Sequence, residues 1–228
     1  MKLPTGFMCT RVKQPDETDW KKLSHDMKYL QYTRHLPLIL RADSNGVAIW
    51  IDASHAVHAD MKGHVRTYAS MGKGAVISSA NQIKLNTVSS TETEIVAVGE
   101  KLPKYIWFWY MREAQSGVAN EDILFQDNQS SMLLENNGIY SAGKGSKHIH
   151  IRYYMITDRI KKKEFKIMYC PTGEMIADFF TKMLQGAQFV KFCDAVLGIN
   201  AKNDDEYLVS YRAVLKKFGL VEEDNADA

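Results

Sequence analysis

At 228 residues, of which 45% are hydrophobic and 25% charged, the chain can bury the core of one ordinary domain and still carry flanking segments. The formal net charge of +2 is too small to identify a nucleic-acid binder and does not exclude one, whereas three widely spaced cysteines exclude a disulfide framework and a CxxC zinc site. No apolar run reaches the roughly 18 residues of a membrane span, so we expect an intracellular protein without membrane contact.

The first half of the chain predicts a helix followed by three strands. Apolar residues recur at helical spacing over Glu17–Tyr32, ahead of Pro37. The run Val47–Ala53 is short and rich in β-formers, which favours a buried strand. Further strands are expected over Val65–Met71 and Ala75–Ser79, because Gly72, Lys73 and Gly74 between them favour a hairpin turn.

The second half predicts alternating helices and strands. Hydroxyls followed by carboxylates at Ser89–Glu94 indicate a helix start, and this helix runs toward Arg112. The elements expected after it are a strand at 123–126, a helix at 130–135, a helix at 148–163, a strand at 165–170 and a helix at 174–184 capped by Thr172. This order predicts an α/β fold with a mixed sheet and helices on both faces.

Two aspartates follow predicted strands. Asp52 closes the strand at 47–53, and Asp127 closes the strand at 123–126. Aspartate is a common strand terminator and turn former, so either one alone indicates little. Functional groups nevertheless gather where strands of such sheets end, and a helical glutamate would complete a carboxylate set.

Four segments resemble the ribonuclease H domain of copia-type retrotransposon Pol polyproteins. They occur in the order and at the spacing of that family, from about Leu38 to Leu184, and are Ser89–Glu94, Gln126–Ser130, Lys147–Tyr153 and Tyr169–Lys182. The segments Phe7–Val12 and Trp20–Tyr32 resemble the end of the reverse transcriptase that precedes this domain in the polyprotein.

The resemblance implies a ribonuclease H-like fold with a mixed five-stranded sheet. It divides the chain into a reverse transcriptase remnant of the thumb or connection at 1–42, the ribonuclease H-like domain at 43–185 and a helical C-terminal tail at 186–228, with one more helix over 203–220. The chain then looks like the C-terminal piece of a longer element. Its expected partners are an RNA/DNA hybrid and the reverse transcriptase portion of the same polyprotein, in a cytoplasmic virus-like particle or the nucleus.

The resemblance also implies a metal site. Asp52, Glu94, Asp127 and Asp178 align with the family's metal-holding, catalytic carboxylates. Two Mg²⁺ ions, for which Mn²⁺ is a substitute, would activate water and relieve charge on the phosphate, and oxygen ligands suit these ions. We expect Asp52 to lie between the ions, Glu94 and Asp127 on one side, and Asp178 on the other.

Several neighbouring residues compete for these roles. Glu92 and Glu94 both have capping-box spacing, so capping alone does not separate them, and the family pattern favours Glu94 as the ligand. His150, where relatives carry an acid, is interpreted as a helix surface residue. His55, His58 and His64 are interpreted as solvated residues of an exposed loop.

Substrate contacts are expected from hydroxyl and amide groups beside the carboxylates. Ser90, Thr91 and Asn128 would meet 2′-hydroxyls of the RNA strand, and a basic stretch at 144–152 would meet phosphates or simply be solvated. The expected activity is hydrolysis of the RNA strand of RNA/DNA hybrids. One alternative is a catalytically weak or inactive retrotransposon remnant that only retains the fold. The other is an integrase or resolvase of the same superfamily, which the motifs disfavour.

Overall fold

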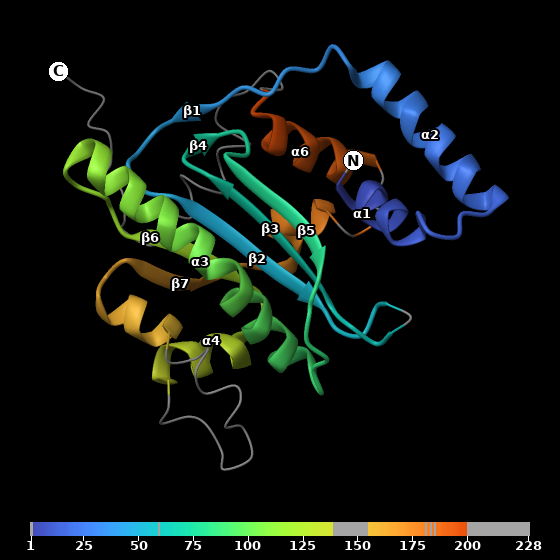
Figure 1. The fold of residues 1–228 in the computed structure, drawn as a ribbon. Helices are drawn as coiled ribbons and strands as arrows, with labels where there is room; N and C mark the ends of the chain where they lie inside the picture. The colour runs from blue at the N-terminus through green and yellow to red at the C-terminus, as the bar shows by residue number, and fades with distance from the viewer. Residues whose placement is uncertain are drawn as a thin grey trace.

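The chain folds around one five-stranded sheet (Figure 1). The structure, a computed structural model, describes residues 2–58, 60–138, 155–180, 182, 184 and 186–199. The sheet order is β5-β3-β2-β6-β7, and its strands are β2 (Ala48–Ser54), β3 (His64–Ser70), β5 (Ile77–Gln82), β6 (Asp122–Gln126) and β7 (Phe165–Tyr169). β3 pairs antiparallel with β2 and β5, whereas β6 pairs parallel with β2 and β7. The mixed sheet expected from the sequence is confirmed.

Both faces of the sheet are buried. Val47, Ile49 and Ile51 enter one hydrophobic cluster, while Ala48 and Trp50 enter the other, because successive side chains of a strand point to opposite faces. This explains why the sequence of β2 is apolar throughout and does not alternate.

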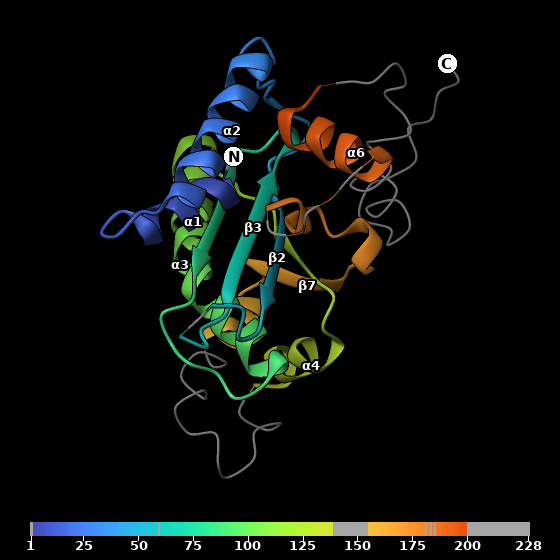
Figure 2. The same cartoon turned by 90° about the vertical axis from the view of Figure 1, so that its right-hand side faces the viewer.

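Helices cover both faces, as Figure 2 shows. α3 (Ser90–Ser116), α4 (Gln129–Asn137) and a helical segment at 155–161 lie on the face of Ile49. The 3₁₀ turn η3 (Ile176–Phe180) and α6 (Gly186–Leu197) cover the face of Trp50. The α/β architecture, a mixed five-stranded sheet with helices on both faces, is therefore the arrangement that the sequence predicts. None of the helices in the described ranges combines the length and apolar character that crossing a membrane requires.

Two helices precede the sheet. α2 (Glu17–Thr33) matches the predicted amphipathic helix, and Asp16 and Asp19 form a capping box at its start. α1 (Lys2–Arg11), which packs beside β5, was not predicted because Pro4 and Gly6 disfavour a helix. Pro4 is tolerated because the first turn of a helix needs no amide donor there.

Two predicted features of the hairpin at 65–79 differ from the structure. β5 begins at Ile77 rather than Ala75, and Gly72–Lys73 form a short strand, β4, that pairs with β1 (Arg41–Ala42). Gly74 adopts φ 73°, and a Cβ there would lie 2.3 Å from the carbonyl oxygen of Ile39. The turn therefore requires glycine for its backbone angle and for the close approach of the neighbouring chain.

The predicted helix at 174–184 is wrong. The segment forms two 3₁₀ turns, η2 (Thr172–Glu174) and η3, and Thr172 lies inside the first turn, where it makes no side-chain cap. Ile176, Ala177 and Phe180 are buried against the sheet, so tertiary packing determines the shape of this short segment. Of the predicted helix at 148–163, the part at 155–161 is helical, and residues 148–154 lie outside the described ranges.

The first part of the predicted C-terminal tail packs against the sheet. Phe192 of α6 is 1% exposed, the backbone amide of Ala75 donates to the carbonyl of Val196, and the hydroxyl of Tyr68 donates to the carbonyl of Ala195 at 3.1 Å. The predicted helix at 203–220 lies outside the described residues. The division into segments at 42 and 185 stays a prediction.

Candidate metal centre

Asp52 lies near the end of the central strand β2. Its side chain is nearly buried, with 7% of the residue exposed, and its Cα partner in the antiparallel neighbour β3 is Arg66. A carboxyl group buried on a central strand requires a compensating positive charge, a metal ion or a bound proton.

Glu94 is held by the first turns of α3. Ser89 caps this helix by accepting a hydrogen bond from the amide of Glu92 at 3.1 Å. Glu94 is 5% exposed, and its Oε1 accepts a hydrogen bond from the amide of Ala53 at 3.1 Å, which ties α3 to the end of β2. Its buried Oε2 has no hydrogen-bond partner within the described part of the chain.

Asp127 follows β6 and precedes α4. It is half-buried, and its Oδ2 accepts a hydrogen bond from the hydroxyl of Thr172 at 3.3 Å. Asn128 caps α4 by accepting from the amide of Ser131 at 3.1 Å, so the chain turns at Asp127 from the sheet into a helix.

These three carboxylates converge although they are far apart in the sequence. One oxygen from each of Asp52, Glu94 and Asp127 lies within 4.8 Å of the others. Burial and the neighbouring acids raise the pKa of Asp52 to about 6, against the opposing effect of Arg66. Burial, followed by Asp52, raises the pKa of Glu94 well above its usual value. A divalent cation suits this set, since oxygen ligands hold it and it would relieve the repulsion.

Asp178 joins this group through a basic side chain. Nη1 of Arg66 lies 2.8 Å from Oδ2 of Asp52 and 2.8 Å from Oδ1 of Asp178. Oδ2 of Asp178 lies 2.5 Å from Nζ of Lys182, one helical turn further along the chain. The structure therefore brings Asp178 close to Asp52, but with a guanidinium between them.

Sequence reasoning missed three charged residues around the centre. They are Arg66, Lys182 and Glu135, the last of which is fully buried in α4 and raises the pKa of Glu94. The apolar neighbours of Arg66 in β3 carried a weak signal, since an arginine inside a buried strand needs an acidic partner. Glu135 gave no such signal, because the sequence around it is typical of the polar surface of a helix.

Glu92 takes the capping role rather than a place in the cluster. Its Oε2 accepts a hydrogen bond from the amide of Val88 at 2.7 Å. Of the three histidines, only His55 is exposed, so the interpretation of a solvated loop is wrong for His64. His64 lies in β3, its Nδ1 is 3.0 Å from Nε2 of His58, and burial lowers its pKa to about 4.

The predicted substrate contacts lie on either side of the cluster in the chain. Ser90 is exposed and Thr91 is half-buried in the first turn of α3, while the Oδ1 of Asn128 is engaged in capping α4. Their role in binding stays a prediction. His150 and the basic stretch at 144–152 lie outside the described residues.

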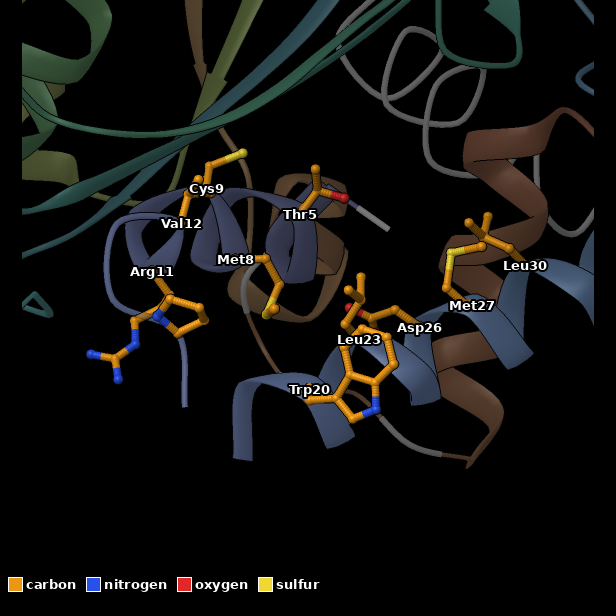
Figure 3. A pocket seen from close by; sticks show the side chains of 11 residues that line it. Thr5, Met8, Cys9, Arg11, Val12, Trp20, Leu23, Asp26, Met27 and Leu30 are labelled. Atoms are coloured by element: carbon orange, nitrogen blue, oxygen red, sulfur yellow. The ribbon is translucent and has the colours of Figure 1, made fainter. Parts of the chain in front are cut away.

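A separate hollow lies between α1 and α2 (Figure 3). Its lining includes Met8 of α1, Val12 directly after that helix, and Trp20, Leu23 and Met27 of α2. No residue of the acidic cluster borders it, and this largely apolar lining offers no carboxylate set that could hold a metal ion.

Sequence comparison relates the chain to retrotransposon proteins. It is 24% identical over 197 residues to the "Retrovirus-related Pol polyprotein from transposon TNT 1-94" of Nicotiana tabacum, a match that covers 86% of this chain and 15% of the relative. The chain is similar to retrotransposon Pol polyproteins. A second relative, the Pol polyprotein from transposon RE2 of Arabidopsis thaliana, is 22% identical over 82% of this chain and 13% of the relative. The chain thus spans less than a sixth of these polyproteins. No protein-family model matches it.

Solved structures with similarity to the chain include ribonucleases H. An RNase H1 isolated from compost is 13% identical, covering 60% of this chain and 93% of that one, with a TM-score of 0.46. A foamy viral protease-reverse transcriptase in complex with dsDNA is 14% identical, covering 59% of this chain and 86% of that one, with a TM-score of 0.41.

Proposed function

We propose that this chain is a metal-dependent endonuclease that hydrolyses the RNA strand of RNA/DNA hybrids, as part of a retrotransposon Pol polyprotein. The observation that carries the proposal is the convergence of Asp52, Glu94 and Asp127 at the end of β2, with the buried Oε2 of Glu94 lacking a partner among the described residues. The similarity to Pol polyproteins supports a substrate of this class.

The three carboxylates would hold Mg²⁺, with Mn²⁺ as a substitute. When bound, such an ion lowers the pKa of a coordinated water and stabilises the charge that develops on the phosphate. Asp52 and Glu94 are fixed by the sheet and by α3, so they provide a rigid part of the site. Asp127 is the most exposed of the three and lies where a phosphate can approach.

Selection of the hybrid would come from the helix starts beside the cluster. Ser90 and Thr91 carry hydroxyls at the start of α3, one exposed and one half-buried, and these can bond 2′-hydroxyls, which only the RNA strand offers. We also propose that the protein acts beside the reverse transcriptase portion of the polyprotein, in a cytoplasmic virus-like particle or the nucleus.

The test is cleavage by the purified chain. With Mg²⁺ we expect cleavage of an RNA/DNA hybrid but not of single-stranded RNA or duplex DNA, and no cleavage in EDTA. Asp127→Asn should lower the rate by at least about a hundredfold, since it removes metal-binding charge at nearly constant volume. Glu92→Gln is the matched control, because glutamine keeps an oxygen that accepts from Val88. Cleavage that survives EDTA, or an Asp127→Asn protein as active as Glu92→Gln, would reject the proposal.

A further inference from the structure

The carboxylates around the metal centre are unequally supplied with positive charge. Both oxygens of Asp178 have a basic partner, Arg66 at 2.8 Å and Lys182 at 2.5 Å. By contrast, Oε2 of Glu94 is buried without a partner in the described ranges, and the hydrogen bond at Oδ2 of Asp127 comes from the neutral hydroxyl of Thr172. The carboxylates of Glu94 and Asp127 therefore need a cation, whereas that of Asp178 already has two positively charged partners.

Arg66 is fixed in its position between the two aspartates. Its side chain is 3% exposed, and the antiparallel register places it directly opposite Asp52. Nη1 contacts Asp52 and Asp178, and Nη2 donates to the hydroxyl of Ser54. The guanidinium therefore places a positive charge directly between the two carboxylates.

A divalent ion that took the position of Nη1 between Asp52 and Asp178 would displace the guanidinium from both oxygens. The displaced guanidinium would remain anchored to β3 within a few ångströms of the ion, where like charges in a buried site repel strongly. The formal charges lead to the same result. The centre has four carboxylates, those of Asp52, Glu94, Asp127 and Asp178, and two basic side chains, those of Arg66 and Lys182. Four negative and two positive formal charges leave a charge of −2, which matches one divalent cation.

We propose that this centre binds a single divalent cation, on Asp52, Glu94 and Asp127, and that Arg66 takes the place of a second ion between Asp52 and Asp178. The inference rests on the proposed function and departs from the two ions that the family resemblance implies. Asp178 is then a positioning residue, which holds Arg66 and Lys182 beside the centre and does not bind metal.

The experiment counts bound metal ions. Mn²⁺ is titrated into the full chain and followed by electron paramagnetic resonance, first with protein alone and then with saturating duplex DNA, which supplies phosphates without an RNA strand to cut. We expect one Mn²⁺ per chain in both conditions. Arg66→Met should bind two, with the altered spectrum of two manganese ions close together, whereas Arg41→Met, which removes an exposed arginine paired with Asp43, should still bind one.

A second variant keeps the test valid if Arg66→Met fails to fold. Asp178→Asn should leave the stoichiometry at one and weaken Mn²⁺ binding by no more than about 10- to 100-fold, the range for a residue behind the ligands, while Asp127→Asn should weaken it by more. Two ions in the unaltered chain, or loss of one ion in Asp178→Asn, would overturn the single-ion inference while leaving the proposed nuclease intact. Binding of no Mn²⁺ at all would instead overturn the proposed function and this inference with it.

Discussion

At the scale of single residues, Glu135 places a carboxyl that favours its protonated form near the candidate metal centre. It is 0% exposed, burial raises its pKa to about 8, and Nε2 of Gln126 donates to it at 3.4 Å. The folded protein therefore binds this proton more tightly than the unfolded chain does. Its contribution to stability is complete at low pH, begins to fall near the unfolded pKa of about 4.5 and is lost as the pH rises past about 8.

Glu135→Gln should remove this loss of stability at high pH, because glutamine has nearly the same volume and does not ionise. We expect equal stabilities of the two proteins near pH 5 and, at pH 9, a variant more stable by at least about 1.4 kcal/mol, the equivalent of one pKa unit. Urea unfolding in EDTA across this range measures the difference. The exposed Glu113→Gln is the control and should show no such trend. A Glu135→Gln protein that gains nothing at pH 9 would mean that Glu135 is charged in the fold.

The sequence was sufficient to place three acids together but not to describe their surroundings. Asp52 lies near the end of one strand, Asp127 follows another, and Glu94 lies one turn into a helix with a clear start. Local patterns and family resemblance therefore indicate a shared site. Arg66 could not be assigned, because its role depends on the register that sets it opposite Asp52 and on a long-range contact to Asp178. Register is a property of the paired strands and is not visible in one strand's sequence.

At the scale of elements, a buried ion pair joins α3 to the sheet. Nη2 of Arg112 lies 2.5 Å from Oδ1 of Asp122 at the start of β6, and the amide of Val47 donates to the same oxygen at 2.9 Å. Nη1 of Arg112 donates to the carbonyl of Asn45, in the loop before β2. Glu94 lies near the start of α3, and this pair attaches the other end of that helix to the sheet. The contacts reach the start of β2, which contains Asp52, and β6, which Asp127 follows.

Arg112→Met should destabilise the fold by about 3–5 kcal/mol, because it leaves Asp122 buried without its partner. Burial raises the pKa of Asp122 to about 7 while Arg112 opposes the rise, so the unpaired acid can take up a proton at low pH. The cost should therefore be larger at pH 8 than at pH 6 in urea unfolding. Arg41→Met, which breaks an exposed pair, should cost less than about 1 kcal/mol. Equal costs for the two variants would contradict the assigned role of Arg112.

Elements with strong local signals matched the structure, and those determined by packing did not. α2 has a capping box and α3 has an N-cap serine, so the starts of both helices follow from local chemistry. α3 continues past the expected Arg112 to Ser116, where Gly117 caps it. Residues 174–180 have apolar spacing that suits an α-helix or a 3₁₀ turn equally. Ile176, Ala177 and Phe180 fill the sheet face beside α6, and this contact selects the 3₁₀ turn that carries Asp178.

At the scale of the whole molecule, charge is nearly balanced. A net charge of +2 gives little attraction for a polyanionic duplex, and Lys182, the basic group beside the centre with an exposed side chain, is paired with Asp178. Binding should therefore depend on a few local phosphate contacts and fall with salt more gently than binding by a strongly basic module, because fewer counterions are released.

The curated relatives are polyproteins of which this chain matches 15% and 13%. If a polymerase region of such a polyprotein holds the hybrid, it raises the effective concentration of substrate at the nuclease without adding a catalytic contact. We therefore expect the chain alone to cleave hybrids weakly, and a fusion to an upstream polymerase region to lower KM about tenfold or more while kcat changes little. Both proteins are compared across a salt series, with an Asp127→Asn fusion as the blank. Equal KM values at every salt concentration would show that this chain binds its substrate equally well without the polymerase region.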